Sequence, residues 1–181
     1  MKIKKFFIFL KFILDKLKNI CYSVFAIEKQ EGIKMTRKEK YPDTKTFHFY
    51  NANPHNRFTT DCVIRAISTG LELEYNTVVK EMAELQCRTG FDPSENTAIN
   101  KYLVGKRWIK MKQPRKTDNT KYTGEEFCKW LNENDNRNES IIANIGGHHI
   151  VCIKKINNKW KIFDTWNSTD GCIGNYWIME D

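Results

Sequence analysis

Residues 146–166, GGHHIVCIKKINNKWKIFDTW, restrict the fold more than any other segment of the chain. Apolar and polar side chains alternate on both sides of the Asn-Asn pair at 157–158, as they do in two half-buried strands. Asparagine tolerates a positive φ, so this pair predicts a two-residue hairpin turn. A turn at a known position also fixes which residues of the two strands face each other.

In this register His149 lies opposite Trp166, and Val151 lies opposite Asp164. Cross-strand partners share a face of the sheet, so His149 and Asp164 become diagonal neighbours about 7 Å apart at the backbone. His148 points to the other face, because successive strand side chains alternate. The sequence therefore predicts an imidazole, at His149, that is oriented by the carboxylate of Asp164.

The remainder of the chain divides into helical patterns first and strand patterns later. Helices are expected at 63–70, 75–86, 96–104 and 123–134, and strands at 107–111, 139–145, 149–156, 159–166 and in a last run toward Trp177. Residues 41–58 mix aromatic residues with Pro and Asn and are expected to be an extended segment. The predicted fold class is α+β, with N-terminal helices packed on a C-terminal antiparallel sheet.

The positive charge is concentrated in a short N-terminal part of the 181-residue chain. The formal net charge is +8, but residues 1–40 hold 11 basic and 4 acidic residues, whereas residues 41–181 hold 19 and 18. The body of the protein therefore lacks the basic surface of a nucleic-acid-binding domain, and no nucleic acid is expected as a partner. We expect a basic extension at 1–40 and one domain at 41–181.

The extension contains an apolar run, 6–14, that lysines interrupt and that is too short to span a bilayer. Its apolar positions follow helical spacing, which predicts a basic amphipathic helix that contacts a membrane surface through residues 1–20. A plain surface helix, or an extension translated upstream of Met35, explains the same pattern. The run is a poor match to a secretion signal, because charged residues break its apolar core.

The six cysteines show no CxxC pair and no compact metal-binding spacing: Cys21, Cys62, Cys87, Cys128, Cys152 and Cys172. A domain of this size does not need disulfides to compensate for a small core. Reduced thiols in a cytoplasmic protein, without a metal or other cofactor, are therefore expected.

Cys62 stands where polar residues give way to apolar helix formers, in TTDCVIRAIS at 59–68. Asp61 and the threonines before it are helix N-cap types, so Cys62 falls in the first turn of a helix. The partial positive charge of a helix N-terminus favours a thiolate, although the Asp61 carboxylate opposes it. A buried, unreactive cysteine is the simpler alternative for this residue.

Taken together, Cys at the start of an early helix, His at the start of a strand and Asp on the next strand resemble the papain-like cysteine peptidase superfamily. The similarity is greatest to bacteriocin-processing peptidases and bacteriophage-encoded relatives. The resemblance implies that Cys62 is the nucleophile, His149 the base and Asp164 the orienting group. It also implies that Asn56, six residues before the cysteine where relatives carry Gln, helps to form the oxyanion hole. The Asp164-Thr165-Trp166 run is similar to the Asn-Ser-Trp run of papain.

The expected function is therefore cleavage of a peptide, isopeptide or amide bond in a protein or peptide substrate. Two alternatives keep the same fold: an acyl transferase of the transglutaminase type, and a binding protein without catalysis. A third alternative is a metal site. Its ligands would be Cys62, His55, His149 and Asp164.

Overall fold

The computed structural model describes residues 35–180, so the amphipathic helix expected at 1–20 and Cys21 lie outside the described residues. The body of the protein forms a compact unit that begins at Arg37. In the described part of the chain, no helix combines the length and the apolar character that crossing a membrane requires.

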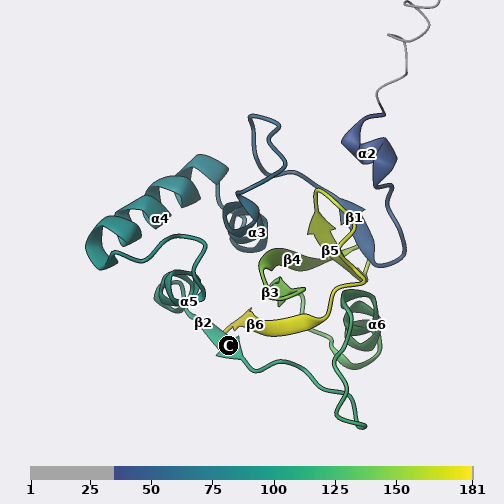
Figure 1. The fold of residues 1–181 in the computed structure, drawn as a ribbon. Helices are drawn as coiled ribbons and strands as arrows, with labels where there is room; N and C mark the ends of the chain where they lie inside the picture. Colours follow the sequence, from purple (N-terminus) through teal and green to yellow (C-terminus); the bar gives the residue numbers. More distant parts are fainter. Residues whose placement is uncertain (1–34, 181) are drawn as a thin grey trace, which may run out of the picture. The chain divides into compact units, whose positions relative to one another are not determined.

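Helices occupy mainly the first half of this unit, and most of the sheet comes from the second half (Figure 1). The helices are α2 (Arg37–Lys40), α3 (Cys62–Leu71), α4 (Tyr75–Thr89), α5 (Asn96–Gly105) and α6 (Gly124–Asn134). The strands are β1 (Phe47–Phe49), β2 (Trp108–Met111), β3 (Ile141–Ile145), β4 (His149–Ile156), β5 (Lys159–Asp164) and β6 (Ile173–Met179). The predicted α+β class, with early helices and a late, mostly antiparallel sheet, is confirmed.

The sheet has six strands in the order β1-β5-β4-β3-β6-β2, and all neighbours except β1 and β5 are antiparallel. Helices α3 and α5 cover one face, with α4 packed against both of them, and α6 covers the other face (Figure 1). Each face has its own apolar cluster. Central strand β3 contributes to both, which explains why all five of its residues are buried.

The β4–β5 hairpin has the predicted turn and the predicted register. Asn157 and Asn158 have φ values of 51° and 59°, which both central residues of a tight hairpin turn require. Cys152 pairs with Phe163, in the register that the sequence predicted. The hairpin therefore places its first residue, His149, near its last, Asp164.

Helix α3 continues one residue beyond its predicted end. It ends at Leu71, and Glu72, with a φ of 55°, closes it by donating its N–H to the carbonyl of Ser68. Gly70 is needed for packing rather than for capping, because a Cβ at this position would lie only 3.0 Å from Cγ1 of Ile142. The glycine thus lets α3 approach the sheet closely.

Strand β1 was not predicted, because the segment 41–58 was expected to be merely extended. Phe47–Phe49 pairs in parallel with the end of β5, and the Phe47 side chain is fully buried. Three residues are too few for an alternating pattern to be recognised. The strand helps to position Asp164, because Tyr50, the residue after β1, donates its N–H to the carbonyl of Asp164 over 2.9 Å.

Helix α2 precedes the boundary at residue 41 that the charge distribution indicated, yet it is attached to the body. Arg37 Nε donates to the carbonyl of Thr165 over 2.8 Å, one residue after Asp164. Its guanidinium carbon also lies 5.3 Å from the centre of the Phe58 ring. Arg37 therefore connects the segment before α3 with the segment after β5.

Removal of residues 1–34 is expected to leave a cooperatively folded body whose Cys62 reacts as in the full chain, because Arg37 and its contacts remain. Removal of residues 1–40 is expected to lower the melting temperature and to slow the reaction of Cys62, since the contact to Thr165 is lost. Thermal melting and probe labelling of the two truncated forms and of Arg37→Ala measure these effects. Loss of cooperative melting in the shorter truncation would contradict the prediction.

Candidate active site

Cys62 is the first residue of α3 and is half-buried. The N–H groups of the first helical turn have no partner inside the helix, and together they carry about half a positive charge. A thiolate at this position is therefore stabilised by the helix itself. The helix begins here because the polar segment 59–61 gives way to a run whose apolar residues Val63, Ala66 and Ile67 pack into the core.

His149 and Asp164 are in direct contact. His149 Nε2 lies 2.6 Å from Asp164 Oδ2, and the side chains are 18% and 3% exposed. The imidazole also packs against Trp166, with ring centres 5.1 Å apart. Because Nε2 is held by the carboxylate, Nδ1 is the ring nitrogen left to exchange a proton with a neighbouring group.

That neighbouring group is the thiol of Cys62, and the two side chains shift each other's protonation. Burial raises the pKa of Cys62, but hydrogen bonds from His149 and the Ile150 N–H, with the charges of His149 and Arg65, bring it below its usual value. Burial lowers the pKa of His149, but Asp164 and Cys62 raise it to about 9. Both shifts favour a thiolate next to an imidazolium over a neutral thiol next to a neutral imidazole.

The Asp164 carboxylate is held on several sides. The Thr165 N–H donates to Oδ1 over 2.7 Å, and Ser168 Oγ donates to Oδ2 over 3.1 Å. The Arg65 guanidinium lies 3.8 Å from Oδ1. These contacts fix the oxygen that His149 uses, so the direction of the imidazole is set by the fold.

Three of the four predicted site residues come together, and one does not. Cys62, His149 and Asp164 form a chain of contacts, whereas the side chain of Asn56 is exposed on the loop before α3, where its backbone has a φ of 53°. The hydrogen bonds described for the trio do not include the Asn56 amide. His148 is exposed, and its side chain is outside this chain of contacts.

Two residues of the site were not predicted from the sequence. Arg65 is only 6% exposed, and a charged residue inside the apolar run VIRAIS, four positions after Asp61, was the signal that an ion pair lies on this helix. Ser168, at 2% exposed, gave no signal, because it belongs to an irregular segment after β5.

The other described cysteines differ from Cys62 in environment. Cys128 and Cys152 are fully buried, and burial raises the pKa of each to about 12. Cys87 and Cys172 are exposed, and none of the five cysteines described is in a disulfide. Cys62 is thus the one described cysteine that has a histidine as a hydrogen-bond partner.

Cys62 is expected to react first when the protein is treated with a small amount of iodoacetamide at pH 6. An ordinary thiol, with a pKa near 8.5, is almost wholly protonated at that pH, whereas the lowered pKa of Cys62 gives it a larger thiolate fraction than an ordinary thiol has. Peptide mapping by mass spectrometry identifies the labelled residue. Exposed Cys87 and Cys172 are internal controls, and preferential labelling of either would contradict the assignment.

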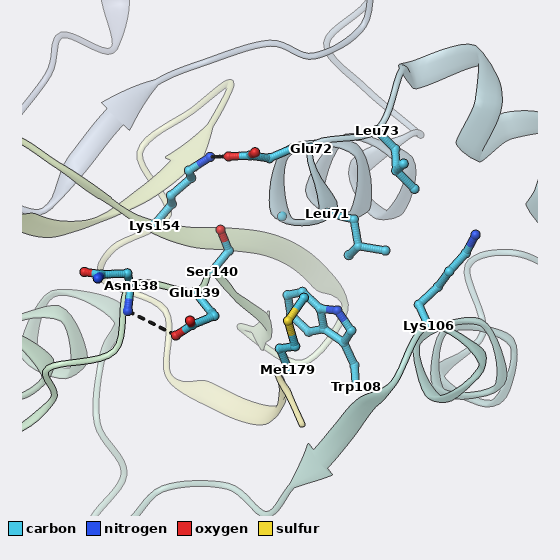
Figure 2. A pocket seen from close by; sticks show the side chains of 11 residues that line it. Leu71, Glu72, Leu73, Lys106, Trp108, Asn138, Glu139, Ser140, Lys154 and Met179 are labelled. Carbon is cyan, nitrogen blue, oxygen red and sulfur yellow. Dashed lines mark hydrogen bonds and ion pairs between the residues drawn. The ribbon is translucent and has the colours of Figure 1, made fainter. Parts of the chain in front are cut away.

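A cavity lies away from this trio, at the other end of α3 (Figure 2). It has a volume of about 480 Å³ and is lined by the end of α3, by Trp108 and by Met179. Two of its charged side chains, Lys154 and Glu72, pair with each other (Figure 2). Neither Cys62, His149 nor Asp164 lines this cavity.

Residues 35–180 contain no group of three or more His, Cys, Asp and Glu side chains arranged to hold a metal ion. His55, the additional ligand of the metal alternative, is exposed on the loop before α3.

In comparisons with known proteins, no family model, no curated protein and no solved structure matched the chain. The geometry of the site is therefore the basis for its function.

Proposed function

We propose that the protein is a cysteine hydrolase that cleaves a peptide, isopeptide or other amide bond through Cys62, His149 and Asp164. The observation that carries this proposal is the pairing of a thiol whose pKa is lowered with an imidazole whose pKa is raised to about 9. An unreactive structural cysteine has no need of such a partner. The contact of the imidazole with a buried carboxylate completes the arrangement.

In the first half of the reaction, the Cys62 thiolate forms a bond to the carbonyl carbon of the substrate. The negative charge moves to the carbonyl oxygen, where the backbone N–H of Cys62, at the start of α3, stabilises it. His149 Nδ1 then gives its proton to the leaving nitrogen. The C–N bond breaks, an amine departs, and a thioester remains on Cys62.

In the second half, water attacks the thioester while neutral His149 accepts a proton from it. The C–S bond breaks and a carboxylic acid leaves, which restores the thiolate and the imidazolium. An amine that replaces water would give a new amide instead. The identity of the acyl acceptor therefore separates a hydrolase from an acyl transferase with the same three residues.

The sequence supports the same function. Nucleophile, base and orienting group occur in the chain order of the papain-like cysteine peptidase superfamily, which the sequence resembles. The membrane-surface contact proposed for residues 1–20 would place the enzyme next to a lipid layer, and protein or peptide remains the expected class of substrate. We propose a reduced, cytoplasmic setting, in line with the free thiols among the described cysteines.

A panel of activated peptide esters and amides, with Cys62→Ala as the matched control, tests the proposal. We expect a mass increase on Cys62 equal to the acyl group, and release of the carboxylic acid in water. Repetition with added glycine methyl ester measures how much acyl group goes to an amine. An amide as the main product would indicate a transferase, and the absence of an acylated Cys62 across the panel would favour a binding protein.

A further inference from the structure

Asp61 directly precedes Cys62 and is the N-cap residue of α3, yet its carboxylate does not cap the helix. Its backbone, with a φ of −124° and a ψ of 23°, differs from the extended backbone of a usual capping residue. Both carboxylate oxygens are bound elsewhere. Arg65 donates to Oδ1, whereas Asn53 Nδ2, at 2.6 Å, and Tyr75 Oη, at 3.0 Å, donate to Oδ2.

This cluster of Asp61, Arg65, Asn53 and Tyr75, here called the Asp61 clamp, has two buried and two partly buried members. Asn53 and Arg65 are 4% and 6% exposed. Burial and the neighbouring Asp61 carboxylate raise the pKa of Tyr75 to about 12, so its hydroxyl remains a hydrogen-bond donor. Arg65 also reaches toward Asp164, which joins the clamp to the proposed catalytic residues.

The clamp has two consequences at the start of α3. The Asp61 side chain, which would normally accept hydrogen bonds from the first-turn N–H groups, does not do so. These N–H groups therefore remain available to a thiolate or an oxyanion. The negative charge nearest to Cys62 in the sequence is neutralised by Arg65. The preceding backbone is strained, since β-branched Thr60 has a φ of 71°, and such strain persists only where surrounding contacts hold it.

We propose that Arg65 is a positioning residue that acts through Asp61, keeping this carboxylate away from the first turn of α3 so that the turn can serve the reacting sulfur. The inference rests on the proposed function, because it assigns Arg65 a role in preparing the nucleophile. The charged groups around Cys62 are His149 from β4, Asp164 from β5, and Arg65 with Asp61 from its own helix.

A buried ion pair that only stabilises α3 would explain the same contacts. The two roles differ in what they do to the sulfur. A structural pair affects melting temperature alone, whereas a positioning pair also changes the pH at which Cys62 becomes reactive. The pH dependence of Cys62 alkylation therefore separates them and requires no knowledge of the substrate.

The experiment measures the rate of Cys62 alkylation by iodoacetamide from pH 4 to pH 10 in the full chain and its variants. Arg65→Gln is expected to raise the midpoint of the profile by about one pH unit, because the positive charge of Arg65 is lost and an unpaired carboxylate then stands next to the thiolate. Arg65→Lys is expected to restore part of the shift. In Asp61→Ala/Arg65→Gln the midpoint is expected to return part of the way, since the opposing carboxylate is gone while the charge of Arg65 stays absent.

A variant with Asn53→Ala and Tyr75→Phe keeps both charges and removes only two neutral donors to Asp61. It is expected to shift the midpoint in the same direction by a smaller amount, and it serves as the test if Arg65→Gln does not fold. An unshifted midpoint in these variants, or a double variant as shifted as Arg65→Gln, would overturn the inference. These results are independent of amide hydrolysis, whose failure would overturn only the proposed function.

Discussion

His149→Ala is expected to slow the covalent labelling of Cys62 by an electrophilic peptide probe about 100-fold or more at neutral pH. The substitution removes the imidazolium that stabilises the thiolate and the proton donor for the leaving group. His148→Ala is the matched control, because it deletes the same side chain one position earlier on an exposed residue. Its labelling rate is expected to stay within about twofold of the unaltered protein, as for a surface substitution.

The measurement is the second-order rate of labelling at Cys62, with circular dichroism and thermal melting to verify that each variant is folded. The contrast between the two histidines depends on strand alternation and on the hairpin register, which the structure gives as Cys152 opposite Phe163. An inactive His148→Ala together with an active His149→Ala would show that both the register and the site assignment are wrong.

The positions of the candidate site residues could be predicted from the sequence where local chemistry decides the structure. The Asn157-Asn158 pair specifies a tight turn, and a tight turn determines the register of both strands. That register alone brought His149 and Asp164 together before any tertiary contact was considered. The position of Cys62 at the start of a helix followed in the same way from the polar segment before it.

The prediction failed where the structure depends on contacts between distant segments. Strand β1 forms because Phe47–Phe49 pairs with the edge of β5, which lies more than a hundred residues later in the chain. Gly70 looked like a helix end, whereas its function is to let α3 approach Ile142. Such packing has no local pattern from which it can be recognised.

The electrostatics at the cysteine also depend on contacts that the sequence alone does not show. Asp61 was expected to oppose the thiolate, because it precedes Cys62 directly. In the folded protein Arg65, Asn53 and Tyr75 bind that carboxylate, so its effect on the thiol is reduced. The sign of a neighbouring charge is readable from a sequence, but its neutralisation depends on which side chains the fold brings to it.

The elements that carry the site are fixed independently of one another. Strand β1 holds the backbone of Asp164 through Tyr50, and Arg37 holds the carbonyl of the next residue, Thr165. Gly70 sets the distance between α3 and the sheet. Because the three side chains of the proposed triad stand on a helix and on two paired strands, small changes in their surroundings should alter the rate of Cys62 labelling more than they alter folding.

Asp164→Ala is expected to slow Cys62 labelling about ten- to a hundredfold at neutral pH, the span that corresponds to one to two pKa units of lost imidazolium stabilisation. The pKa of His149, which Asp164 helps to raise to about 9, should fall in this variant. The rate should therefore decline at a lower pH on the alkaline side of the profile. The protein should also melt earlier, since Ser168 and the Thr165 N–H lose a buried acceptor at a cost of about 1–3 kcal/mol each.

Asp164→Asn is the matched variant, because it keeps an acceptor oxygen for His149 and nearly the same volume but removes the charge. Its labelling rate at neutral pH should lie between those of Asp164→Ala and the unaltered protein, and its melting temperature should fall less. If Asp164 acts mainly by orienting the ring, Asp164→Asn recovers most of the labelling rate. If Asp164 acts mainly through its charge, Asp164→Asn recovers little of the rate. In either case the alkaline side of the pH profile stays shifted to lower pH. Asp164 Oδ2 lies 2.6 Å from His149 Nε2. Equal labelling rates for Asp164→Ala and the unaltered protein would show that this contact has no effect on the imidazole, and that the carboxylate plays no part in preparing His149.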